Sequence, residues 1–197
     1  LAIHAMDMMR QQVRPETRIG TWIIAGGTAS NVIPEFGELE VTVRHTERDY
    51  LNGLSEQIKK IFEGAALCTG TTVDIEFYGN PYDDMNQNQR GTLLIEDVMT
   101  DMGIDFKSGP ADIGGSSDIG NVSYQCAAFH PKLRLAGDDK VCHSKEFAAA
   151  MLEPTIEQTI LDGANIIGRT LLRLVEHPAV LEEIVAEFNA SKFNVSK

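Results

Sequence analysis

The sequence lacks several features that mark particular classes of protein. It has only three cysteines among 197 residues, without metal-finger spacing, which favours reduced thiols in a cytoplasmic protein over a disulfide framework. It has no strong Lys/Arg cluster and a net charge of −12, which argues against nucleic acid or an acidic membrane surface as a partner. No apolar run is long enough to cross a bilayer. We therefore expect a cytoplasmic protein with neither nucleic acid nor a membrane as its partner.

Two common arrangements of functional residues are also missing. The glycine- and serine-rich run at residues 114–117 is not followed by Gly-Lys-Ser/Thr, so it is not a nucleotide-binding loop. Ser117 and Asp118 have no suitably placed histidine, so a serine triad is not expected. From the residues alone, this run is an ordinary loop or a weak anion-binding turn.

A motif in the first quarter of the chain can bind a carboxylate. A short β-branched and aromatic strand is broken by a glycine pair, and a second strand with alternating apolar residues follows at residues 37–45. Arg44 lies on the polar face of this strand, and Asn31 lies in the loop that leads to it. A guanidinium and an amide suit a carboxylate ligand. The alternative is an ion pair of Arg44 with Glu38 or Glu40 on its own strand.

This segment resembles the lid, or dimerisation, domain of the two-metal exopeptidase and aminoacylase family. That family includes desuccinylases, auxin-conjugate hydrolases and aminobenzoyl-glutamate hydrolases. The resemblance is carried by Gly26, Gly27, Ala29, Asn31-Val32-Ile33-Pro34 and Arg44. It implies that Asn31 and Arg44 bind the carboxylate of the substrate, often across a homodimer.

A second block resembles the C-terminal part of the catalytic domain of the same family. It comprises Ser117-Asp118-Ile119-Gly120-Asn121-Val122-Ser123, Phe129-His130-Pro131 and His143-Ser144-Lys145-Glu146-Phe147. The resemblance implies that His143 is a metal ligand, and that Asp118 and Asn121 are pocket residues that help to bind substrate. His130 either polarises the substrate carbonyl or is structural.

The residues around His143 also allow simpler interpretations. Ser144 is well placed as the N-cap of a following helix, which would hold His143 on rigid backbone. Sequence position alone favours the interpretation of His143 as a loop histidine without a metal. Cys142 adjoins it, and we expect a plain buried thiol rather than a nucleophile or a ligand.

Most ligands of a two-metal site are missing from the sequence. It has no His-x-Asp motif, and the acid pairs at residues 83–84, 138–139 and 182–183 do not fit, since the first two lie in expected loops and the third on a solvated helix face. We therefore expect the C-terminal part of a longer enzyme, inactive alone, with two zinc or manganese ions held mostly by residues outside this chain. The resemblance implies hydrolysis of N-acyl or N-aroyl amino acids or dipeptide-like substrates. The alternative is a non-catalytic dimerisation or carboxylate-binding module.

The pattern predicts two domains joined by a polar, turn-rich segment at residues 79–88. Residues 1–84 would form an α+β, ferredoxin-like lid, and residues 85–197 the C-terminal portion of an α/β catalytic domain. Helices are expected at residues 3–13, 49–67, 90–102, 154–176 and 179–189, and strands at 21–25, 37–45, 71–78, 122–128 and 132–136. Gly70 is expected to end the helix at 49–67. We expect the apolar stripe of the helix at 154–176 to be core; its residues are Ile156, Ile160, Ala164, Ile167, Leu171 and Leu174.

Overall fold

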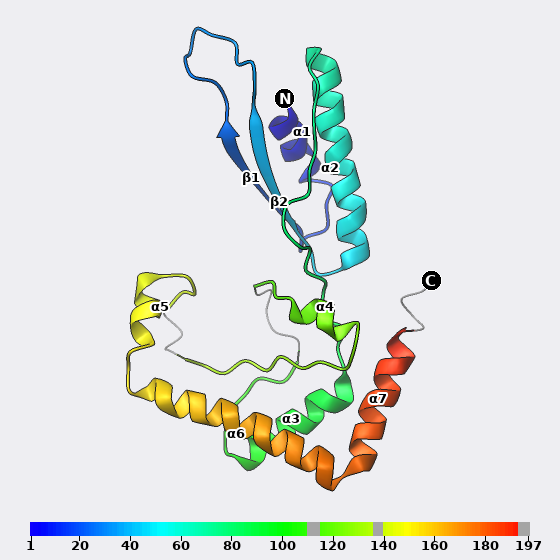
Figure 1. Cartoon of the computed structure of the whole chain (residues 1–197), viewed down its shortest axis with the longest axis vertical. Helices are drawn as coiled ribbons and strands as arrows, with labels where there is room; N and C mark the ends of the chain where they lie inside the picture. The colour runs from blue at the N-terminus through cyan, green and yellow to red at the C-terminus, as the bar shows by residue number, and fades with distance from the viewer. Residues whose placement is uncertain (110–114, 136–139, 193–197) are drawn as a thin grey trace. The chain divides into compact units, whose positions relative to one another are not determined.

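The computed structural model describes residues 1–109, 115–135 and 140–192 (Figure 1). The acid pair at residues 138–139 lies outside this range. The chain divides after Asp84 into two compact units. The first contains residues 1–84 with Gly115 and Ser116, and the second contains the other described residues.

The first unit packs two helices against a two-stranded antiparallel sheet. In chain order it contains α1 (Ala2–Met9), β1 (Arg18–Ala25), β2 (Glu38–Arg44) and α2 (Arg48–Thr69). The register pairs Ile19 with Val43 and Thr21 with Val41. Two of the three strands and both helices predicted for this region are present, although β1 begins earlier and α1 ends earlier in the chain than expected.

The core of the first unit lies between one face of the hairpin and the two helices. Met6 of α1, Ile19 of β1, and Leu54 and Ile58 of α2 are buried together, since the apolar residues of each element recur on one side. Gly70 ends α2 with a φ of +66°, a left-handed conformation that glycine adopts without steric cost. The helix end predicted from Gly70 is therefore confirmed.

The strand predicted at residues 71–78 is not formed. This segment runs without ladder hydrogen bonds to β1 or β2, and the described sheet has two strands. Its contacts are made by side chains: Tyr78 hydrogen bonds to Glu40 and Thr42, and Lys59 Nζ lies 4.7 Å from the centre of the Phe77 ring. An alternating pattern predicts an extended backbone, but a strand also needs a paired neighbour, which the pattern does not specify. The described unit is mixed α and β without a complete ferredoxin-like sheet.

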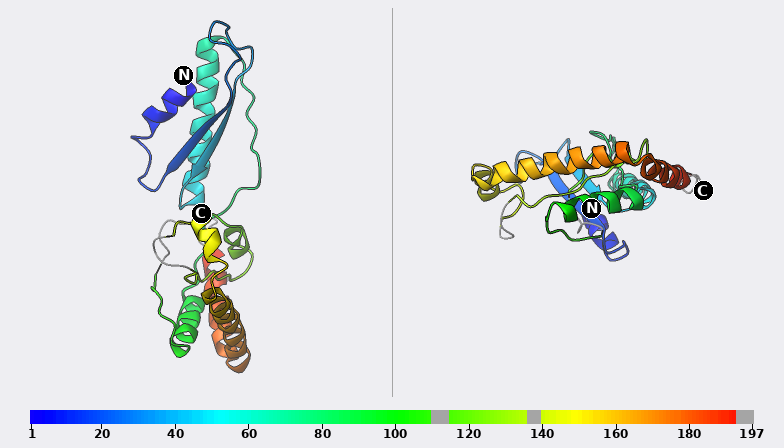
Figure 2. Two further views of the ribbon diagram at one scale, coloured as in Figure 1. Left: turned by 90° about the vertical axis from the view of Figure 1, so that its left-hand side faces the viewer. Right: turned by 90° about the horizontal axis from the view of Figure 1, so that it is seen from below.

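The second unit is built from helices in its described residues. These are α3 (Gln89–Asp101), α4 (Ile119–Ser123), α5 (Lys145–Ala150), α6 (Thr155–Glu176) and α7 (Pro178–Lys192). Figure 2 shows α3 running beside α6, and Figure 1 shows α7 turning back from the end of α6. Ile95 and Met99 of α3 are buried with Ile166 of α6. The three long helices predicted here are confirmed.

The strands predicted at residues 122–128 and 132–136 are wrong for their described residues. Val122 belongs to α4, because its N–H donates to the Asp118 carbonyl at 3.2 Å, and a turn follows. Residues 127–135 have no regular secondary structure and no ladder partners. Phe129 and Leu133 pack instead against the α3–α6 core, so their apolar character serves helix packing rather than a sheet.

The apolar stripe of α6 does not lie in the core as predicted. Ile160 and Ile167 are each 63% exposed, and Leu171 is 59% exposed. The buried residues of this helix are Ile156 and Ile166. Among the described residues, no helix combines the length and the apolar character that a transmembrane span requires.

Candidate functional site

Arg44 lies at the end of β2, on the outer face of the hairpin. Its Nη2 donates a hydrogen bond to Ser116 Oγ at 2.6 Å, and both residues belong to the first unit. Glu40, one of the two carboxylates considered as its ion-pair partner, hydrogen bonds instead to Tyr78. Arg44 is exposed, so its remaining guanidinium donors face solvent, where an anionic ligand can reach them.

Asn31 lies in the exposed loop between β1 and β2. The conformation of this loop depends on Gly27 and Pro34. Gly27 has a φ of +104°, and a Cβ placed there would lie 2.8 Å from Pro34 Cγ. The motif residues Gly27 and Pro34 therefore pack against each other and shape the loop that carries Asn31. The Val32 N–H closes a turn within it by donating to the Ala29 carbonyl.

Asn31 and Arg44 lie at opposite ends of the hairpin. β2 alone runs from Glu38 to Arg44, which is about 20 Å at roughly 3.3 Å per residue. Figure 1 shows the loop at one end of the hairpin and the start of α2 at the other. The sequence interpretation placed the two side chains on neighbouring backbone around one carboxylate. Within a single chain the strand length keeps them too far apart for that, and their separate binding roles stay predictions.

The second motif forms a short helix with a buried serine. Ser117 Oγ lies 3.2 Å from Asp118 Oδ1 and accepts from the Ile119 N–H at 3.4 Å, which shapes the entry to α4. Asp118 is exposed and Asn121 is half-buried. Ser123 is fully buried and donates to the Gly120 carbonyl at 2.6 Å. The predicted pocket role of Asp118 and Asn121 stays a prediction, whereas Ser123 is structural.

Asparagines in the segment predicted as a hinge form an anchor that the sequence analysis missed. Asn86 donates through its backbone N–H to Ser123 Oγ at 2.9 Å, and through its side chain to the Ser123 carbonyl and to Ser191 Oγ. Asn88, only 3% exposed, accepts from the Gly91 N–H and donates to the Ile184 carbonyl. The signal was available for Asn88, since an asparagine directly before a helix is a typical N-cap.

His143 is held in an unusual backbone conformation immediately before α5. Its φ is +66°, the one non-glycine residue with a positive φ among those described. Ser144 caps the helix by accepting from the Phe147 N–H at 3.0 Å, so the predicted cap is confirmed. A non-glycine residue in this region costs roughly 1–3 kcal/mol and is concentrated at functional sites. The exposed imidazole is thus carried on strained backbone, and its role as a metal ligand stays a prediction.

His130 and Cys142 complete the placement of the candidate residues. His130 is exposed and follows Phe129, which packs in the core of the second unit. Both the catalytic and the structural interpretation of His130 stay predictions. Cys142 is exposed, so the expected buried thiol is wrong. The loop before α5 explains this, because the chain has not yet entered packed structure at that residue.

The described residues do not by themselves assemble a metal centre. Within residues 1–109, 115–135 and 140–192, no three His, Cys, Asp or Glu side chains are grouped so that they could hold an ion. An ion bound by His143 would therefore need ligands from outside the described residues. Asp83, from one of the acid pairs, instead forms an ion pair with Arg48 at 2.7 Å.

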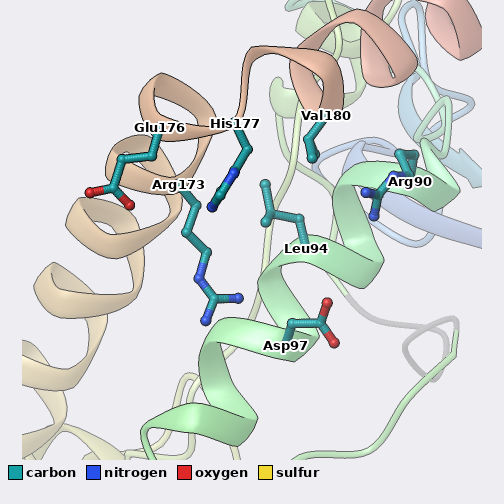
Figure 3. A pocket seen from close by; sticks show the side chains of 7 residues that line it. All are labelled: Arg90, Leu94, Asp97, Arg173, Glu176, His177 and Val180. Carbon is teal, nitrogen blue, oxygen red and sulfur yellow. The ribbon is translucent and has the colours of Figure 1, made fainter.

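A hollow in the second unit lies away from all the predicted site residues. Arg90 and Asp97 from α3 and Arg173 from α6 face it (Figure 3). Its full lining is Arg90, Leu94, Asp97, Arg173, Glu176, His177 and Val180. The two arginines are already engaged, Arg90 with Glu183 and Arg173 with Asp101. The hollow is therefore a surface lined by ion pairs. Glu183 lies on the exposed face of α7 as expected, and there it pairs with Arg90.

Comparison with known proteins identifies the family. No family model matches the chain. Mouse (Mus musculus) Xaa-Arg dipeptidase is 30% identical over 191 residues, which is 95% of this chain and 44% of that protein. The human (Homo sapiens) Xaa-Arg dipeptidase is 28% identical over 194 residues, with the same two shares. A homologue of a p-aminobenzoyl-glutamate hydrolase subunit, from Haemophilus influenzae, is 29% identical over 82 residues, covering 42% of this chain and 19% of its own length.

The chain belongs to the exopeptidase and aminoacylase family. The family predicted from the two motifs is thus confirmed, and its matched relatives are named as hydrolases. The chain spans less than half the length of the two dipeptidases. The two motifs therefore correspond to only one part of a protein of that length.

Proposed function

We propose that this chain is part of a cytoplasmic, metal-dependent amidohydrolase that cleaves a dipeptide or an N-acyl or N-aroyl amino acid. The observation that carries the proposal is the match of 95% of the chain to two proteins named Xaa-Arg dipeptidase. A substrate of this type presents a free carboxylate next to the scissile amide. The exposed guanidinium of Arg44 and the amide of Asn31 are suitable groups for such a carboxylate.

The residues of the second unit would act on the other side of the scissile bond. His143, fixed before α5, would bind one of two divalent ions, zinc or manganese, and His130 would polarise the carbonyl. The bound ions would supply Lewis-acid activation of water, with their other ligands outside the described residues. Asp118 and Asn121 at α4 would line the pocket.

A homodimer would resolve the separation of Asn31 and Arg44. Trp22 and Ile24 on the outer face of β1 are 63% and 45% exposed, and β1 pairs on one edge only in the described sheet. Antiparallel pairing of two β1 edges about a two-fold axis would place opposite ends of the two hairpins side by side. Asn31 would then approach Arg44 of the partner subunit. The first unit would serve as the dimerisation lid, with its sheet completed into a ferredoxin-like arrangement.

The test compares variants of the full gene product that contains these residues. Hydrolysis of an arginine-terminated dipeptide and bound divalent metal are measured together. His143→Ala is expected to lower kcat at least a hundredfold and to reduce the metal content. Arg44→Lys is expected to raise KM about tenfold with metal content unchanged, because one bidentate contact to the carboxylate is lost.

Arg18→Lys is the matched control for Arg44→Lys. Arg18 lies opposite Arg44 in the β1–β2 register, but its guanidinium donates to the Pro15 and Thr17 carbonyls. It should leave KM unchanged. Unaltered metal content and activity in His143→Ala would contradict the proposal. Ligand binding and dimerisation without any metal-dependent hydrolysis would favour the non-catalytic module instead.

A further inference from the structure

The strongest unexplained feature of the second unit is the exposed apolar face of α6. Six large apolar residues of this one helix are more than half exposed: Ile160, Leu161, Ile167, Leu171, Leu172 and Val175. At about 100° per residue, these residues fall within one sector of about 140° around the helix axis. Ala164 and Gly168 fall in the same sector, so no polar side chain interrupts it between Ile160 and Val175. We call these eight residues the outer face of α6.

The outer face is separate from the face that α6 already buries. Ile166 is buried on the side toward α3, where it packs with Ile95 and Met99. The polar strip between the two faces contains Asn165 and Arg169. An apolar stripe wider than about 100° is typical of a helix face that packs against a neighbour. Exposed apolar patches of this extent mark interaction surfaces.

We propose that the outer face of α6 is an internal packing surface, covered by an apolar face of the polypeptide that corresponds to the unmatched part of the dipeptidases. The chain covers 44% of each dipeptidase while 95% of the chain is matched, so each dipeptidase contains more than as much again of sequence that this chain does not match. That polypeptide is the occupant with the length to bury a 22-residue helix. The absence of charge from the outer face requires an apolar partner surface.

Thiol labelling can measure whether the outer face is covered. Leu171→Cys is made in a background in which Cys68, Cys126 and Cys142 are replaced by serine, since all three are exposed. Its reaction rate with a maleimide is compared between the 197-residue chain and the full gene product. We expect fast labelling in the chain and at least tenfold slower labelling in the full product.

Arg169→Cys is the matched control, because it lies on the polar strip of the same helix and should label fast in both proteins. Fast labelling of Leu171→Cys in the full product would overturn the proposal. Slow labelling of Leu171→Cys in the 197-residue chain would also overturn the proposal. A labelling rate that depends on protein concentration would mean that a second copy covers the outer face, and a rate that does not would mean that the chain itself covers it. Circular dichroism establishes that the variants fold. The readout requires no activity, so it stands apart from the test of the proposed hydrolysis.

Discussion

The two longest helices of the molecule have equal length and opposite surroundings. α2 and α6 each contain 22 residues and each carries an apolar stripe. In α2 the stripe is packed against the sheet and α1, and among its large apolar residues only Leu67 is exposed. In α6 one face is packed against α3 and a second apolar face is open.

The difference shows what helical periodicity can and cannot predict. A stripe at helical spacing identified both helices, but it does not say whether the surface it needs is already present in the same unit. The charged residues of α2 fill the side away from its stripe, so one layer of packing is enough. In α6 the wide apolar face points away from α3, and that neighbouring helix covers only the opposite side, where Ile166 is buried.

The largest expected effect is a difference in the loss of stability when a leucine is truncated on the buried stripe of α2 or on the open face of α6. Leu54→Ala should lower the free energy of unfolding of the first unit by about 3 kcal/mol, because Leu54 is 3% exposed and its removal leaves a cavity. Leu171→Ala should change the stability of the second unit by less than about 0.5 kcal/mol. Urea denaturation followed by Trp22 fluorescence reports the first unit, since Trp22 is the sole tryptophan and lies in β1.

Hydrogen exchange of α6 amides reports the second unit in the same samples, because the two units need not unfold together. Equal effects of Leu54→Ala and Leu171→Ala would break the comparison, since they would mean that the outer face of α6 is already packed within this chain.

A pair of glycine substitutions sharpens the comparison inside the second unit. Gly91 of α3 lies directly under Phe129, so a Cβ at this position would overlap the ring. Gly91→Ala should therefore destabilise the unit by about 2 kcal/mol through overpacking. Gly168 on the outer face of α6 has open space around it, and Gly168→Ala should stabilise by up to about 1 kcal/mol through helix propensity. Thermal unfolding by circular dichroism should give shifts of opposite sign, and shifts of the same sign would contradict this account.

Elements that depend on a local pattern were predicted correctly from the sequence. The predictions were wrong where the structure of a segment depends on a partner that is distant in the chain. The helix end at Gly70 and the cap at Ser144 rest on nearby residues, and both are present. The strand predicted at residues 71–78 needed a pairing partner, which alternation does not reveal. The run around Val122 is apolar and short, and local hydrogen bonds made it helical.

The candidate site shows the same division. The loop that carries Asn31 and the backbone that holds His143 follow from motif residues close in sequence. The distance between Asn31 and Arg44 depends on the full length of β2, and the anchor between Asn86 and Ser123 joins segments 37 positions apart. Neither arrangement can be read from a single motif.

The polar contacts of the second unit provide a third, smaller test. Both carboxylate oxygens of Glu187 on α7 accept backbone N–H groups at the start of α3, from Gln89 at 2.6 Å and Arg90 at 2.8 Å. Glu187→Gln should cost about 1 kcal/mol, because an amide replaces one acceptor oxygen with a donor and removes the favourable charge at the helix N-terminus. Glu182→Gln on the exposed side of α7 should have no measurable effect. Equal effects of the two variants, measured by urea denaturation, would mean that Glu187 contributes only as a surface charge.

The smallest expected effect concerns Tyr78 on the first unit. A hydrogen bond with Glu40 raises the pKa of Tyr78 above its ordinary value of 10.0, because the neutral phenol can donate to the carboxylate and the phenolate cannot. The folded state therefore holds this proton more tightly than the unfolded state. The resulting stability is fully present below pH 10 and is lost as the pH rises through the folded-state pKa.

Ultraviolet titration of the wild-type chain against Tyr78→Phe isolates this phenol from the other tyrosines. Glu40→Gln should return its titration toward the ordinary value, while the two-stranded sheet is retained. An unchanged titration in Glu40→Gln would show that the segment at residues 71–78 is not fixed to β2 by this contact. Because the segment has no ladder hydrogen bonds to β2, its side-chain contacts are what position it beside the hairpin, and Tyr78 is where that positioning can be measured.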